Sequence, residues 1–174
     1  MPNVLLSEPK TLIRDWGEEI LLIWRPTYCA KLLKRKAGTK GNLQYHVKEE
    51  SHYLLSGRLL VRWDPGTGQL TEQVFEPGAV WTVLPGVVHQ EEAVTDCVEI
   101  EAGDPTLDDR VRMEQVYGFA PDGGLPSMTP LQAAQHLAGL GTAFLARGWD
   151  CQDWAREISK RSVILPKPAG LPAR

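Results

Sequence analysis

The most informative segment of the chain reads Gly41-Asn-Leu-Gln-Tyr-His-Val-Lys-Glu-Glu-Ser-His-Tyr-Leu-Leu-Ser-Gly57. Because side chains alternate across a strand, Gln44 and His46 share one face of a first strand. After a turn at 47–49, Glu50 and His52 share one face of the next strand. If this hairpin turns both faces inward, Gln44, His46 and Glu50 converge. Their amide oxygen, imidazole and carboxylate suit a borderline or hard divalent cation.

A second segment, Gly78-Ala-Val-Trp-Thr-Val-Leu-Pro-Gly-Val-Val-His89, supplies a fourth ligand. Its Pro-Gly turn redirects the chain, and His89 follows three residues after Gly86. Four ligands on three antiparallel strands leave one or two positions for water or substrate, which is typical of catalytic metal sites. We therefore predict one divalent ion (zinc, manganese, iron or nickel), bound by Gln44, His46, Glu50 and His89.

The chain divides into two regions that differ in their sequence pattern. Residues 1–119 contain short apolar or alternating runs between turn residues, which predicts a sandwich or barrel. The expected strands are 19–25, 28–36, 42–46, 52–56, 59–63, 70–75, 79–84, 88–94 and 97–101. Residues 120–174 are expected to form a helical extension that packs on the barrel or on a dimer partner. Thr129 and Pro130 are a good helix start, and the expected helices span 131–137 and 150–161.

The composition excludes several classes of protein. A chain of 174 residues with a net charge of −3 gives no reason to expect nucleic acid or an anionic membrane as a partner. No run approaches the ~20 apolar residues of a membrane span, and residues 1–10 do not resemble a secretory signal. The three cysteines, Cys29, Cys97 and Cys151, suggest no disulfide framework. These features favour a cytoplasmic protein with reduced thiols.

Both segments resemble the two sequence motifs of the cupin superfamily. In motif 1, G-x5-H-x-H-x3-4-E-x6-G, the spacing of the second histidine, the glutamate and the last glycine is matched by His46, Glu50 and Gly57. Gln44 stands where most cupins have the first histidine. The resemblance implies a jelly-roll barrel with a metal in its mouth, and a homodimer.

Motif 2, G-x5-P-x-G-x2-H-x3-N, is matched in spacing by Gly78, Gly86 and His89. Leu84 replaces its proline and Ala93 replaces its asparagine. The two motifs together therefore predict an all-β cupin jelly-roll barrel followed by a short helical C-terminal segment.

The glutamine narrows the resemblance to the cupin domain of type II mannose-6-phosphate isomerases, in which a Leu-Gln-x-His string supplies ligands. The similarity covers roughly residues 14–119, from Trp16-Gly17 to the stretch Leu107-Asp-Asp-Arg-Val-Arg-Met-Glu-Gln-Val-Tyr-Gly118. Phe119 stands where that family has an arginine, and His52 stands where it tends to have tryptophan. The linked nucleotidyltransferase domain of the family is absent from this sequence.

Three further residues are candidates for catalysis. His52 has the parity to face the barrel interior, either as a general acid or base or as a hydrogen-bonded core histidine. Glu101 alternates with apolar residues, as does Glu99, so these carboxylates either face the metal or, as we expect, form a polar outer face. Lys31 matches a lysine of the resembled family and either meets an anionic substrate or is a solvated edge residue.

The leading functional hypothesis is a sugar or sugar-phosphate isomerase or epimerase, in which the ion polarises a carbonyl and a nearby base moves a proton. The first alternative is a non-haem iron or manganese dioxygenase that acts on a small organic substrate. The second is a non-catalytic cupin that binds a small molecule. The three hypotheses share one cofactor, a divalent metal ion, and a small-molecule ligand.

Overall fold

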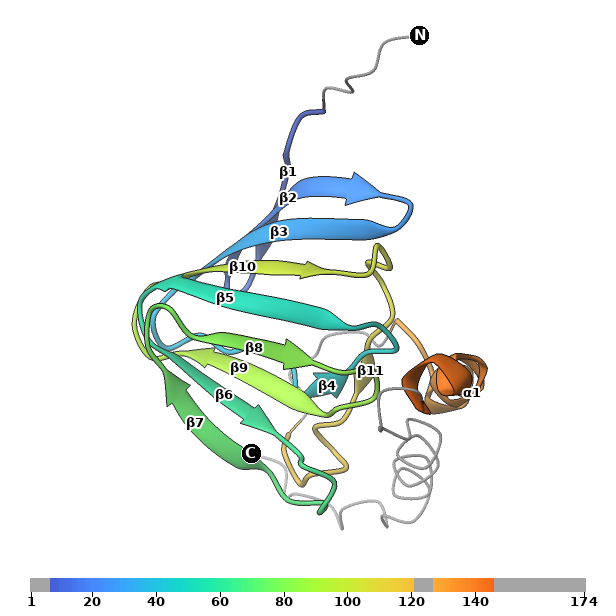
Figure 1. The fold of residues 1–174 in the computed structure, drawn as a ribbon. Helices are drawn as coiled ribbons and strands as arrows, with labels where there is room; N and C mark the ends of the chain where they lie inside the picture. Colours follow the sequence, from blue (N-terminus) through green and yellow to red (C-terminus); the bar gives the residue numbers. More distant parts are fainter. Residues whose placement is uncertain (1–6, 121–126, 146–174) are drawn as a thin grey trace, which may run out of the picture.

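The structure, a computed structural model, describes residues 7–120 and 127–145. In these residues the chain forms two antiparallel sheets that face each other, and one helix (Figure 1). The first sheet has the strand order β1 (Lys10–Arg14), β2 (Gly17–Arg25), β3 (Tyr28–Arg35), β10 (Cys97–Gly103), β5 (Glu50–Ser56), β8 (Val80–Val83). The second has the order β11 (Val111–Arg112), β4 (Gln44–Tyr45), β9 (His89–Ala93), β6 (Leu59–Trp63), β7 (Thr71–Phe75).

The tight connection between β5 and β6 depends on Gly57. This residue has φ of 83°, and a Cβ atom added to it would lie 2.1 Å from the carbonyl oxygen of Asp96. Only glycine allows both the left-handed backbone and this close approach. The last glycine of the first motif therefore has a steric role, because it lets the hairpin pass under the neighbouring turn.

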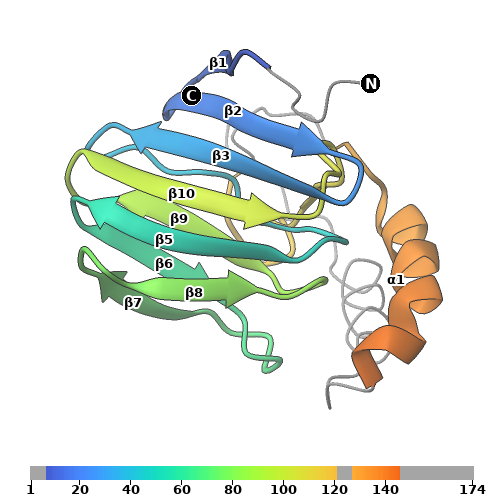
Figure 2. The same ribbon diagram turned by 45° about the horizontal axis from the view of Figure 1, so that its top comes forward.

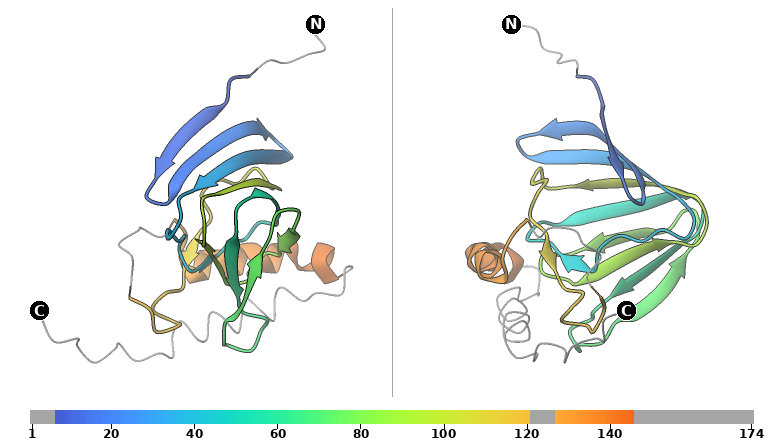
Figure 3. Two further views of the ribbon diagram at one scale, coloured as in Figure 1. Left: turned by 90° about the vertical axis from the view of Figure 1, so that its left-hand side faces the viewer. Right: turned by 180° about the vertical axis from the view of Figure 1, so that it is seen from behind.

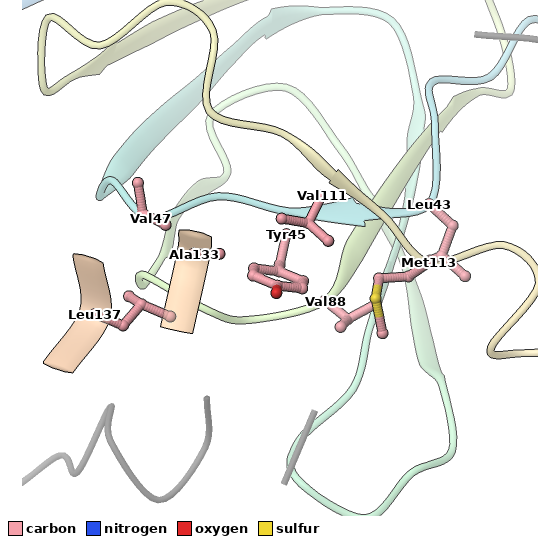
Figure 4. Packing of buried hydrophobic residues seen from close by; sticks show 8 residues of the cluster. All are labelled: Leu43, Tyr45, Val47, Val88, Val111, Met113, Ala133 and Leu137. Carbon is pink, nitrogen blue, oxygen red and sulfur yellow. The ribbon is translucent and has the colours of Figure 1, made fainter. Parts of the chain in front are cut away.

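Apolar side chains form two buried clusters. One cluster consists of Leu43, Tyr45, Val47, Val88, Val111, Met113, Ala133 and Leu137 (Figure 4). The other consists of Leu54, Leu59, Val61, Ala93 and Cys97, with Trp63, Phe75 and Trp81 packed against it. The predicted metal ligands belong to neither cluster, because Gln44 and His46 alternate along the chain with Leu43, Tyr45 and Val47 and line the cavity instead.

The helix α1 (Pro130–Leu145) lies across one end of the two sheets (Figures 2 and 3). Its start is fixed by a capping box: the Gln132 N–H donates to Thr129 Oγ1, and the Thr129 N–H donates to Gln132 Oε1. Ala133 and Leu137 are fully buried against the barrel. In the described part of the chain, no helix is long and apolar enough to cross a membrane.

The expected strands are present with ends shifted by a few residues, and 59–63 is matched at both ends. Two strands are unexpected. β1 is an edge strand with almost no burial, so its sequence lacks the alternation that reveals a strand, and β11 has only two residues. The helix predicted over 131–137 runs on to Leu145, and the one predicted over 150–161 lies outside the described residues.

The expectation that Glu99 and Glu101 form a polar outer face is wrong. β10 lies between β3 and β5, and both carboxylates point into the barrel, where they are 0% and 7% exposed. They do alternate with Val98 and Ile100, but the glutamates, rather than these apolar residues, face the barrel interior. The reason is that the barrel interior is charged here: Lys31 and Arg35 of the neighbouring strand β3 pair with Glu101 and Glu99.

Candidate metal centre

Three of the predicted metal ligands meet inside the barrel. His46 follows β4, Glu50 begins β5 and His89 begins β9. One ligand atom from each lies within 4.8 Å of the other two, and His46 Nε2 is 3.4 Å from Glu50 Oε2. All three side chains are buried. The Pro-Gly turn secures this arrangement, because the Gly86 N–H donates to the carbonyl of His46 at 2.7 Å.

Hydrogen bonds on the far side of each imidazole fix which nitrogen is available. Nδ1 of His89 lies 3.0 Å from the carbonyl of Val87, and Nδ1 of His46 lies 3.1 Å from a carboxylate oxygen of Asp109. A carbonyl and a carboxylate only accept, so both Nδ1 atoms donate, and in the neutral imidazoles both Nε2 atoms carry the lone pair that a metal ion would use. Metal-binding histidines are typically oriented in this way.

The electrostatics keep His89 neutral and Glu50 ionised. Burial, together with the nearby His46, lowers the pKa of His89 to about 4, so its imidazole is neutral at pH 7. Burial alone would raise the pKa of Glu50, but His46 and Lys48 hold it well below its usual range. Lys48 Nζ lies 2.7 Å from Glu50 Oε1 and leaves Oε2 facing His46.

The hydrogen bonding of Gln44 shows whether a cation fits this cluster. Gln44 pairs with His89 across β4 and β9, and its Nε2 lies 3.1 Å from His46 Nε2. Its Oε1 is buried without a hydrogen-bond partner. The two ends of an amide are exchanged by a half turn, which brings the orphaned oxygen to the side of the His46 lone pair. Two imidazole nitrogens, a carboxylate and an amide oxygen then face one point, a donor set that suits zinc, manganese, iron or nickel.

Asp109 is a site residue that the sequence did not reveal. It is fully buried, and one of its oxygens accepts from His46 while the other accepts from the backbone N–H groups of Val47 and Lys48. In the sequence it is one of two adjacent aspartates next to Arg110, so an ion pair is the simplest interpretation there. The segment that carries it returns to the barrel mouth only in the folded chain.

Replacing Asp109 with asparagine is expected to lower metal affinity about 10–100-fold. Asparagine has one oxygen, so it cannot accept from His46 and from both backbone N–H groups at once. Competition with a chelating dye would measure the loss. Asp108→Asn is the matched control because that carboxylate is exposed; equal affinities in the two variants would contradict the role of Asp109.

The three catalytic candidates lie side by side on adjacent strands. Lys31 of β3 is directly opposite Glu101 of β10, which is directly opposite His52 of β5. Lys31 Nζ lies 2.6 Å from Glu101 Oε1. Lys31 is 6% exposed, so the alternative that it is a solvated edge residue is wrong. His52 stacks on Trp81, with ring centroids 4.9 Å apart.

Burial and neighbouring charges shift the pKa values of both Lys31 and Glu101. Burial and the negative charge of Glu50 raise the pKa of Glu101 in spite of Lys31. Burial would lower the pKa of Lys31, but Glu101 and Glu50 raise it, so the ammonium stays protonated. The pair thus combines a carboxylate that accepts protons more readily than usual with a fixed positive charge.

The metal cluster and the catalytic candidates open onto one cavity of about 100 Å³. Its walls include Gln44, His46, Glu50, His52, His89, Lys31 and Glu101. Positive side chains also contribute to it, namely Arg14, Arg35, Lys48 and Arg110. The same walls also include Glu19 and Glu91, which pair with Arg14 and Arg35, so the cavity is lined by charges of both signs.

Comparison with solved structures bears on the fold. The capsular polysaccharide assembling protein CapF of Staphylococcus aureus superposes with a TM-score of 0.55 and 19% identity, over 62% of this chain and 34% of CapF. Oxalate decarboxylase of Bacillus subtilis superposes with a TM-score of 0.56 and 15% identity, over 66% of this chain and 32% of the decarboxylase. Both are cupin-fold proteins. The chain has the cupin fold.

This confirms the predicted fold class, an all-β barrel with a short C-terminal helix. The chain spans about a third of the length of these two structures. No protein-family model and no curated protein matches its sequence. At identities of 15% to 19% the likeness extends to the fold alone, so the function is argued below from the residues of the site.

Proposed function

We propose that this cupin is a metal-dependent isomerase or epimerase that moves a proton between adjacent carbons of a small anionic sugar or sugar phosphate. The observation that carries this proposal is the buried Lys31–Glu101 pair, which faces the same cavity as the four metal-binding candidates. The string Leu43-Gln44-Tyr45-His46, which resembles that of type II mannose-6-phosphate isomerases, supports the sugar class.

In this proposal Gln44, His46, Glu50 and His89 hold one divalent ion, whose chemistry is to polarise a substrate carbonyl as a Lewis acid. Glu101 accepts a proton from the carbon next to that carbonyl and returns it to the former carbonyl carbon, while the proton of the neighbouring hydroxyl group passes to the former carbonyl oxygen. Its raised pKa brings it closer to the working pH, which is what a general base requires. Lys31 holds the carboxylate in position and offsets the negative charge of the substrate.

The remaining positive side chains of the cavity suit the anionic group of the substrate. Arg14 and Arg110 both line the cavity and are about one third exposed, so they can reach a ligand that enters from solvent. A guanidinium binds a carboxylate or phosphate through two parallel hydrogen bonds. The arginine that the resembled isomerases place at position 119 is thus replaced, in this proposal, by Arg110 on the cavity wall.

The test is hydrogen exchange between substrate and solvent. Purified protein loaded with zinc or manganese is incubated anaerobically in deuterated water with a panel of aldose and ketose phosphates, and nuclear magnetic resonance follows deuterium at the carbon next to the carbonyl. Exchange is expected in the wild type. Glu101→Gln is expected to lower the exchange rate at least about 100-fold, because proton transfer by a positioned group contributes about 10²–10⁴-fold.

Glu92→Gln is the matched control, since this carboxylate lies on the barrel but pairs with Arg62 outside the cavity. Equal rates in the two variants would remove Glu101 from the mechanism. Oxygen uptake by the iron-loaded protein with small organic acids would replace the proposal with the dioxygenase alternative. Ligand binding without exchange and without oxygen uptake would leave a non-catalytic binding protein.

A further inference from the structure

A second cluster of ligand-type side chains lies beneath the metal centre. It consists of His52 on β5, Glu91 on β9 and Glu99 on β10, and all three are buried. Their ligand atoms lie within 4.8 Å of one another. His52 Nδ1 is 3.7 Å from Glu91 Oε1 and 3.8 Å from Glu99 Oε2. These distances are too long for direct hydrogen bonds.

The atoms that face one another in this cluster are orphaned. Both ring nitrogens of His52, Glu91 Oε1 and Glu99 Oε2 are buried without a hydrogen-bond partner. Buried polar atoms are normally satisfied, and leaving them unsatisfied is costly. We therefore expect an additional group, which the chain itself does not supply, at the centre of the cluster.

Arg35 holds the two carboxylates but leaves one oxygen of each free. Its Nε donates to Glu99 Oε1 at 2.7 Å, its terminal nitrogen donates to Glu91 Oε2, and its guanidinium packs on the Trp16 ring. One guanidinium thus faces two carboxylates, and the free oxygen of each carboxylate faces His52 Nδ1.

On two strands, the residues of this cluster follow the metal-binding candidates by two positions, so they lie on the same face of each strand. On β5, Glu50 is followed two residues later by His52, and on β9, His89 is followed two residues later by Glu91. The next residues on the same faces, Leu54 and Ala93, belong to the apolar cluster that closes the barrel. Two residues of strand span about 7 Å, so the two polar layers lie about that far apart.

We propose that His52, Glu91 and Glu99 bind a second divalent cation about 7 Å from the first centre. One imidazole nitrogen and two carboxylate oxygens are ligands that manganese, iron and zinc accept. The cation occupies the position that His52 Nδ1, Glu91 Oε1 and Glu99 Oε2 face. The barrel then holds two ions, one at its mouth and one in its interior.

The test is the metal content of matched variants. Apoprotein is dialysed to equilibrium against manganese, and the metal is counted by mass spectrometry. The wild type is expected to hold two ions per chain, and His52→Phe and His89→Ala one each. The phenylalanine keeps the stacking on Trp81 and removes both nitrogens. His136→Phe, which changes an exposed histidine on α1, is the matched control and is expected to keep both ions.

A spectroscopic measurement on the wild type needs no variant and therefore does not depend on whether His52→Phe folds. Two manganese ions about 7 Å apart are expected to broaden each other's electron paramagnetic resonance signal through dipolar coupling, whereas one isolated ion keeps a resolved hyperfine pattern. In His52→Phe the resolved pattern is expected to return.

The outcomes separate the two centres. A single ion that is kept in His52→Phe and lost in His89→Ala would overturn the second site and leave the first intact. In that case a trapped water molecule with a protonated His52 would occupy the cluster. A single ion that is lost in His52→Phe and kept in His89→Ala would support the second site and overturn the first, together with the proposed function.

Discussion

Replacing Gly57 with alanine is expected to lower the free energy of unfolding by about 2–6 kcal/mol. The left-handed backbone conformation alone costs a non-glycine residue about 1–3 kcal/mol. The added methyl group would lie 2.1 Å from the Asp96 carbonyl oxygen and 2.8 Å from the Cys97 Cα atom. Both atoms belong to the backbone, so relief requires the hairpin to move, at a further cost of about 1–3 kcal/mol. Urea denaturation measures the change.

Gly78→Ala separates the two contributions. Gly78 also has a left-handed φ, of 94°, but no atom lies within 4 Å of the position that its methyl group would take. Only the conformational cost of about 1–3 kcal/mol is therefore expected. If both variants lost the same free energy of unfolding, the close approach at Gly57 would not be a determinant of the fold.

Replacing His89 with alanine is expected to weaken metal binding at the mouth of the barrel by more than about 100-fold, since even outer partners of a ligand contribute about 10–100-fold. His89 brings a free Nε2 lone pair and a lowered pKa to the centre. The barrel is expected to stay folded because His89 belongs to neither apolar cluster. Chelator competition measures the affinity and circular dichroism checks the fold.

His136→Ala is the control for this substitution, because the same side chain is removed from an exposed position on α1. Its affinity for metal at the barrel mouth should equal that of the wild type. Unchanged affinity in folded His89→Ala would mean that the predicted ligand set is wrong, in spite of the convergence of His46, Glu50 and His89.

The fold could be predicted because its determinants are local. The spacing of Glu50 and Gly57, and of Gly86 and His89, depends on turns that are fixed by neighbouring residues. The convergence of Gln44, His46 and Glu50 follows from strand alternation within one short segment. The strand pattern predicts a barrel because each buried strand carries its own apolar periodicity.

The deeper part of the site could not be predicted because it depends on pairing between distant strands. Glu91 lies in the polar run Gln90-Glu91-Glu92, and nothing local shows that its side chain faces the interior. Sequence reasoning places Glu99 on the wrong face because a charged residue in a strand usually faces solvent. The charge of Arg35, 64 residues away in sequence, makes its burial possible.

The contacts that orient the metal centre have a consequence for refolding kinetics. The hydrogen bond between His46 and Asp109 joins residues 63 positions apart, and Gln44 pairs with His89 across β4 and β9, which are neighbours in the sheet but distant in the sequence. Such non-local contacts form only after long loops have closed, and chains dominated by them refold slowly, in about milliseconds to seconds. Recovery of ion binding after dilution from denaturant would therefore mark the last steps of topological closure, later than the appearance of β-hairpin signal.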